Sequence, residues 1–155
     1  MNSASKDVIF EEFVRRWQSP LRRYLFHLSG GNGALADDLA QESFIKAFLH
    51  WESRRTDQGR AWLFRIAYRT FLDHKRSAKE YVQQENITSS YAAATHIQVL
   101  KQTLECLDEK ESNLIILSCI EEFTQAEIAQ TTGMALGSVK TTIRRAKEKL
   151  RKHLQ

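Results

Sequence analysis

Residues 123–154 have the sequence FTQAEIAQTTGMALGSVKTTIRRAKEKLRKHL, which predicts two helices separated by a glycine turn. Thr124 and Glu127 have the spacing of a capping box, in which the threonine hydroxyl accepts from the third helical amide and the glutamate reaches back. Gly133 stands where a tight turn after a helix needs a positive φ. From Gly137 a long helix is expected. Its predicted buried stripe consists of Val139, Ile143, Ala146 and Leu150. This arrangement is typical of a helix-turn-helix.

The second of these helices carries basic and hydroxyl side chains near its N-terminal end. They are Lys140, Thr141, Arg144 and Arg145. In a helix-turn-helix this end enters the major groove, where Arg and Lys bond guanine N7 and O6. The alternative is a charged helix end that only meets solvent. Because the capping box and the turn accompany these side chains, we predict that all four contact duplex DNA.

The rest of the chain also predicts helices. Phe10, Phe13, Val14 and Trp17 mark an amphipathic helix that ends at Ser19, and Pro20 suits the first position of a second one. Further helices are expected over residues 34–51 and 59–79, and after residue 97.

Composition supports an all-α fold. The chain has 155 residues, 42% of them hydrophobic, but only one proline and six glycines. An all-β sandwich needs a turn signal about every 8–12 residues, which this composition cannot supply. No apolar run is long enough for membrane insertion, and no secretory signal precedes the first helix, so a cytoplasmic protein is expected. Cys106 and Cys119 lie in no metal-ligand pattern, so we expect no metal or other cofactor, and two buried structural thiols.

Charge is unevenly distributed along the chain. The net charge is +4, but residues 60–79 carry +5, residues 98–129 carry −5 and residues 130–155 carry +6. Two separate basic blocks predict two separate anionic contacts. The acidic block between them is expected to face a protein partner.

Residues 81–96 lack any apolar period and are rich in Ser, Thr, Gln and Asn. We interpret them as a flexible linker, which could extend to about 55 Å. The chain is therefore expected to form two small helical domains, residues 1–80 and 97–155, that need not touch.

Taken together, the two halves resemble an extracytoplasmic-function (group four) sigma factor of the bacterial sigma-70 family. The matching stretches are DDLAQESFIKAF (residues 37–48), AWLFRIAYRTFLDHKR (61–76), LECLDEKESNLIIL (104–117) and the helix-turn-helix over 123–154. The resemblance implies a four-helix sigma region 2 followed by a helix-turn-helix sigma region 4. It also implies that the chain binds core RNA polymerase and directs it to promoter DNA.

The resemblance also assigns sites. Asp38, Gln41 and Glu42 match the face that binds the β′ clamp helices of the polymerase. The residues that match the minus-ten reader are Arg65, Tyr68, Arg69, Lys75 and Arg76. Lys140, Thr141, Arg144 and Arg145 match the positions that recognise the minus-thirty-five element, in a region that binds the β flap. Arg69 replaces the usual asparagine and cannot accept a hydrogen bond. The family also implies an anti-sigma factor as a partner.

Two other classes of function compete with this one. An enzyme is disfavoured because the five histidines are scattered and no HExxH, GxxxxGK[ST] or GxSxG motif occurs. We therefore expect no catalytic residue. A stand-alone helix-turn-helix regulator with an N-terminal sensing or dimerisation domain explains residues 123–154, but leaves the basic block at 60–79 unexplained.

Overall fold

The computed structural model describes residues 3–53, 59–80 and 94–155, and in these ranges every regular element is helical, as predicted. The N-terminal half (residues 3–80) contains α1 (Ser3–Leu28), α2 (Gly33–Leu49), the short 3₁₀ turn η1 (Trp51–Ser53) and α3 (Gly59–Glu80). The C-terminal half (residues 94–155) contains α4 (Ala94–Leu104), α5 (Glu109–Ile115), the π-helical turn η3 (Ile116–Ile120), α6 (Gln125–Thr132) and α7 (Leu136–Leu154).

One predicted boundary is wrong. Ser19 does not end a helix, because α1 continues through Pro20 to Leu28. A proline inside a helix removes one backbone hydrogen bond. Here the apolar stripe continues across it, and burial of Phe13 before the proline and of Leu21 after it holds both segments in one helix.

The predicted linker lies mostly outside the described residues, of which 81–93 are not part. Its last three positions, 94–96, belong to the first turn of α4.

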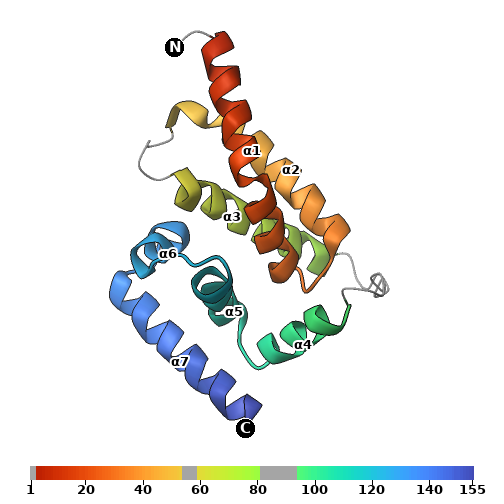
Figure 1. Cartoon of the computed structure of the whole chain (residues 1–155), viewed down its shortest axis with the longest axis vertical. Coiled ribbons are helices and arrows are strands. Elements are labelled where there is room, and N and C mark those ends of the chain that lie inside the picture. The colour runs from red at the N-terminus through yellow and green to blue at the C-terminus, as the bar shows by residue number, and fades with distance from the viewer. Residues whose placement is uncertain (1–2, 54–58, 81–93) are drawn as a thin grey trace.

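The two halves share a hydrophobic core. Helix α3 lies between the other N-terminal helices and the C-terminal half, where it contacts α6 (Figure 1). Phe64 of α3 is fully buried, with its ring 4.9 Å from those of Tyr24 and Phe123. The same cluster reaches Leu117 and Ile128 in the C-terminal half. The sequence left open whether the halves touch; they do.

A smaller cluster holds α7 against α4 and α5. Leu107, Ile115 and Ala146 are its buried members, and Cys106 and Leu150 pack on it half-buried. Cys119 is exposed, so the expectation of two buried thiols is wrong for that residue.

In the residues described, no helix combines the length and the apolar character that crossing a membrane requires.

Candidate functional site

The helix-turn-helix forms as predicted. The Thr124 hydroxyl accepts from the Glu127 amide at 3.1 Å, and the Glu127 carboxylate accepts from the Thr124 amide at 3.0 Å. Gly133 ends α6 with a φ of 76°. Val139, Ile143 and Ala146 are buried on α7. These features fix the orientation of α7 against α6.

Basic side chains on α7 form one exposed stripe. It consists of Lys140, Arg144, Lys147 and Arg151, spaced i, i+4, i+7 and i+11. With Gln125 at the start of α6, they line a shallow groove. Lys147 and Arg151 were not among the predicted recognition residues, although their spacing from Lys140 would have indicated them.

The other two predicted recognition residues lie on the next stripe round α7. Arg145 is exposed. Thr141 is half-buried, and its hydroxyl donates to the Gly137 carbonyl at 2.9 Å. The Thr141 hydroxyl hydrogen is therefore engaged within the helix.

The residues predicted for the minus-ten element divide between two faces of α3. Arg65, Arg69 and Arg76 are exposed, and their spacing of i, i+4 and i+11 puts them on one stripe. Tyr68 and Lys75, seven residues apart, lie on the adjacent stripe. The structure thus brings three arginines together and separates the other two residues from them.

The stripe with Tyr68 and Lys75 lies against the acidic start of α5. Lys75 forms an ion pair with Glu109, with Nζ 3.4 Å from Oε1. Burial raises the pKa of the half-buried Tyr68, and the nearby carboxylates of Glu109 and Asp108 add to the effect. The acidic block over residues 98–129, expected to face another protein, therefore faces α3 at this point.

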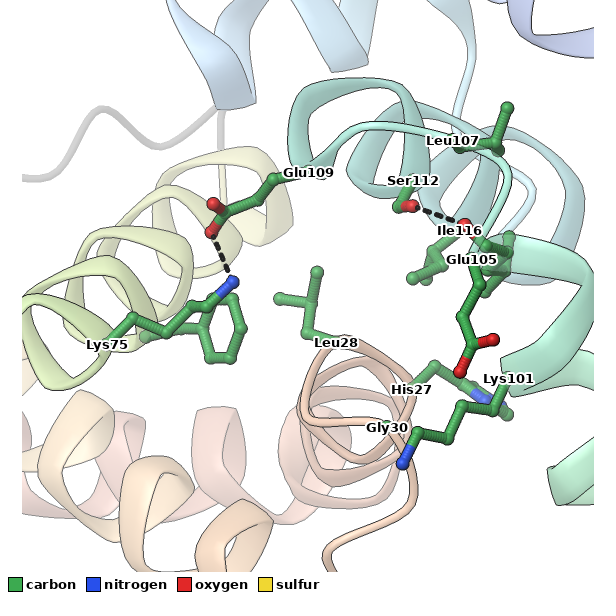
Figure 2. Close-up of a pocket in the computed structure, with 12 residues that line it drawn as sticks. His27, Leu28, Gly30, Lys75, Lys101, Glu105, Leu107, Glu109, Ser112 and Ile116 are labelled. Atoms are coloured by element: carbon green, nitrogen blue, oxygen red, sulfur yellow. Dashed lines mark hydrogen bonds and ion pairs between the residues drawn. The ribbon is translucent and has the colours of Figure 1, made fainter. Parts of the chain in front are cut away.

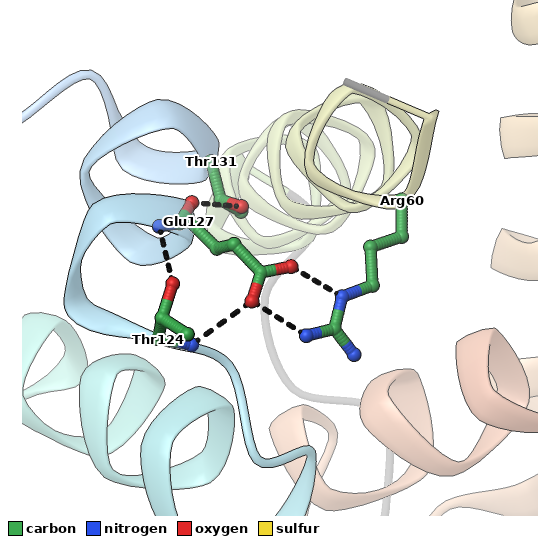
Figure 3. A network of polar contacts seen from close by, with 4 residues as sticks. All are labelled: Arg60, Thr124, Glu127 and Thr131. Atoms are coloured by element: carbon green, nitrogen blue, oxygen red, sulfur yellow. Dashed lines mark hydrogen bonds and ion pairs between the residues drawn. The ribbon is translucent and has the colours of Figure 1, made fainter. Parts of the chain in front are cut away.

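Two further ion pairs join the halves. Arg23 of α1 donates from Nε and Nη2 to Glu121 at 2.9 and 2.8 Å, and the Glu121 side chain is only 2% exposed. Arg60 of α3 donates from the same atoms to Glu127 at 2.5 and 2.6 Å (Figure 3). The Arg60 hydrogen bonds lower the pKa of Glu127. No local sequence signal could have shown these contacts, since Arg60 and Glu127 are 67 residues apart.

An open pocket of about 250 Å³ lies beside these contacts, between the halves (Figure 2). His27 and Gly30, near the end of α1, face Lys101 and Glu105 across it, and Lys75 closes another side. Burial lowers the pKa of His27 from its ordinary value of 6.5; the nearby Glu121 raises it and Arg23 lowers it further.

We therefore expect acid to weaken the fold through His27. Because its folded-state pKa is below 6.5, the unfolded chain binds the proton first as the pH falls. The stabilising contribution is complete above the ordinary pKa and declines as the pH falls through it. The thermal midpoint should drop between about pH 7.5 and about pH 5.5, and His27→Gln should reduce that drop. His74→Gln, at an exposed position on α3, is the control and should leave the drop unchanged.

The polymerase-binding residues predicted from the resemblance share one exposed face of α2. Asp38, Gln41 and Glu42 are all exposed, and Glu42 pairs with Lys46 on the same helix at 3.2 Å. The same face continues into apolar residues that the sequence reasoning missed. These are Ile45 and Leu49, 61% and 70% exposed. The face is therefore polar at its start and apolar towards its end.

No cluster of three or more metal-ligating side chains occurs in the described parts of the chain.

Comparison with known families covers both halves. The Sigma-70 region 2 model matches residues 13–81, and the Sigma-70 region 4 model matches residues 97–150. The sigma factor YlaC of Bacillus subtilis is 31% identical, over 93% of this chain and 91% of its own. The chain belongs to the sigma-70 family.

Other relatives place it among the extracytoplasmic-function sigma factors. SigW of Bacillus subtilis, a sigma factor of that group, is 28% identical over 81% of this chain and 78% of its own. The predicted family and the predicted function, an alternative sigma factor in transcription initiation, are confirmed. The stand-alone regulator is disfavoured because region 2 accounts for the N-terminal half.

Two solved structures are similar to this sigma factor over 94% of its chain, each with a TM-score of 0.77. One is CnrH in complex with the cytosolic domain of CnrY, 27% identical and covered over 86% of its length. The other is the sigma factor RpoE in complex with the anti-sigma factor NepR from Bartonella quintana, 26% identical and covered over 96%.

Proposed function

We propose that this sigma factor docks on core RNA polymerase through α2 and places α3 and α7 on the two elements of a promoter. The observation that carries the proposal is the separation of three exposed surfaces. The acidic and amide face of α2 and the basic stripes of α3 and α7 lie on different elements of one chain. Three partners could be bound at once only by surfaces arranged on separate elements.

In this mechanism α2 and the β′ clamp helices form the main contact with polymerase. Asp38, Gln41 and Glu42 supply carboxylates and an amide for hydrogen bonds and ion pairs with a basic partner helix. Ile45 and Leu49 add apolar area at the end of the same face. The β flap would bind the C-terminal half.

Helix α3 would bind the melted minus-ten strand. Arg65, Arg69 and Arg76 form a basic track for its phosphates, and Tyr68 offers a ring on which an unstacked base can lie. Lys75 adds a positive charge beside Tyr68. With Arg69 in place of asparagine, the pocket for a flipped base gains a donor and loses an acceptor.

Helix α7 would enter the major groove of the minus-thirty-five element. Lys140, Arg144 and Arg145 lie towards its N-terminal end, where base edges are within reach. Lys147 and Arg151 follow on the stripe and would contact phosphates. Residues 1–80 and 97–155 would act as two domains, and no step of this function requires catalysis.

The direct test is transcription in vitro with purified core polymerase, with start sites mapped across a bacterial genome. The chain should co-purify with core polymerase in equal amounts and produce defined start sites. If it instead protects duplex DNA without polymerase and does not co-purify with it, the regulator is the correct assignment.

Once a promoter is known, Arg145→Ala should weaken its minus-thirty-five binding by about 1–3 kcal/mol, because each lost base contact has that effect. Arg151→Ala, with the same charge change further along α7, should weaken binding to all sequences alike. Fluorescence anisotropy on the promoter and on a scrambled duplex measures both. An equal loss on the two duplexes for Arg145→Ala would make it a phosphate contact.

An anti-sigma factor is the proposed regulatory partner, supported by the complex of the similar RpoE with NepR. The proposed location is the cytoplasm, where a bacterial polymerase is available.

A further inference from the structure

The ion pairs that join the two halves all have the same polarity. Among the described residues, the cation always belongs to the N-terminal half and the carboxylate to the C-terminal half. The pairs are Arg23–Glu121, Arg60–Glu127 and Lys75–Glu109. This matches the charge blocks of the sequence, +5 over residues 60–79 and −5 over residues 98–129.

The carboxylates lie along much of α3, the helix proposed to bind the minus-ten strand. Arg60 is in its first turn and Lys75 near its end, a separation of about 22 Å along a helix. Between them Tyr68 is half-buried, close to Asp108 and Glu109. A single strand of DNA would present a row of negative charges to the same side chains.

This arrangement is too compact for both promoter elements. A Cβ atom on Gly133, in the turn before α7, would lie 3.7 Å from Nη2 of Arg65 on α3. Elements centred about 25 base pairs apart are separated by about 85 Å of straight duplex. The halves must therefore separate before α3 and α7 can occupy both elements.

The interface contains polar groups that favour separation. The Tyr24 hydroxyl donates to Oδ1 of Asn113, and both side chains are fully buried. No acceptor in the described part of the chain reaches Nδ2 of Asn113. A buried amide without a partner costs free energy in the closed form that water recovers on opening.

We propose that the free chain inhibits itself: the acidic face of its C-terminal half occupies α3 in place of the minus-ten strand. The inference rests on the proposed function of α3. Opening exchanges the carboxylates of Glu109 and Glu127 for DNA phosphates on Lys75 and Arg60. The same opening releases α7 to reach the second element.

The test uses zero-length carbodiimide cross-linking of the full chain as a reporter of closure. Nζ of Lys75 is 3.4 Å from Oε1 of Glu109, so activation of the carboxylate joins them as an amide. Peptide mass spectrometry gives the yield of this link. In parallel, anisotropy measures binding of a fluorescein-labelled, mixed-sequence single strand of about 20 nucleotides, longer than one binding site.

The opening variant is Glu121→Gln with Glu127→Gln, which leaves the Lys75–Glu109 reporter intact. Glutamine is close in shape to glutamate and preserves the capping box of α6. The control is Glu11→Gln with Glu12→Gln, which makes the same charge change on exposed positions of α1. Arg60→Gln is a second opening variant with the opposite charge change.

Both opening variants should lower the cross-link yield relative to wild type and control. The double glutamine variant should also bind the strand about fivefold more tightly than its control, the factor expected when the closed form loses one modest ion pair. If the wild type gives no Lys75–Glu109 link, or if the link weakens without tighter DNA binding, self-inhibition is wrong. If the link responds but no variant binds DNA, the role proposed for α3 fails and the inference falls with it.

Discussion

Replacing Phe64 by alanine is expected to lower the free energy of unfolding by about 3–5 kcal/mol, the usual cost of removing a buried aromatic ring. Phe64 is fully buried, and its ring lies 4.9 Å from both Tyr24 and Phe123. The truncation thus leaves a cavity where the two halves meet. Urea unfolding followed by circular dichroism measures the loss.

Phe48→Ala is the matched control for this change. Phe48 is an aromatic residue of the same half, but it is 36% exposed and contacts Phe10 at 5.0 Å on the outer side of α2. Its truncation should cost about 1 kcal/mol, typical of a partly exposed site. Equal losses for the two variants would contradict the central position of Phe64 in the shared core.

Reversing the charge of Asp38 and Glu42 to lysine is expected to reduce transcription with core polymerase by about a hundredfold or more. Two central interface residues that each cost about 2 kcal/mol produce a loss of that size. Both side chains are exposed on α2, so the fold should be preserved. Run-off transcription and co-purification with polymerase measure the effect.

The control for charge alone is Glu11→Lys with Glu12→Lys, on exposed positions of α1. It should leave transcription within about twofold of wild type, as expected for surface changes away from an interface. If Asp38→Lys with Glu42→Lys co-purifies with polymerase like this control, α2 is not the docking surface.

Much of the fold was predictable because its signals are local. The Thr124–Glu127 capping box, the positive φ of Gly133 and the buried stripe of α7 each depend on residues within a few turns of one another. The boundary at Pro20 was predicted wrongly because the weight of burial on both sides of a proline depends on the neighbouring helices. The π-helical turn η3 had no signal in the apolar run that contains it.

The candidate sites follow the same division. The sequence and the family resemblance indicated which helices carry the basic stripes and the acidic face. They did not indicate that Tyr68 and Lys75 lie on a different face of α3 from its three exposed arginines and turn towards α5. The apolar extension of the α2 face could have been found from its spacing, since Ile45 and Leu49 continue the period of Glu42.

The sequence by itself determined an all-helical chain with two basic helices, an acidic block between them and a helix-turn-helix at the end. Periodicity, caps and charge are written in short segments, so they survive without knowledge of the packing. Only the tertiary structure decided that the acidic block meets α3. That contact joins side chains such as Arg23 and Glu121, 98 residues apart, and depends on the core that Phe64 and Phe123 share. No local pattern specifies which distant charge a side chain will face, because packing of the apolar cores brings the charges together.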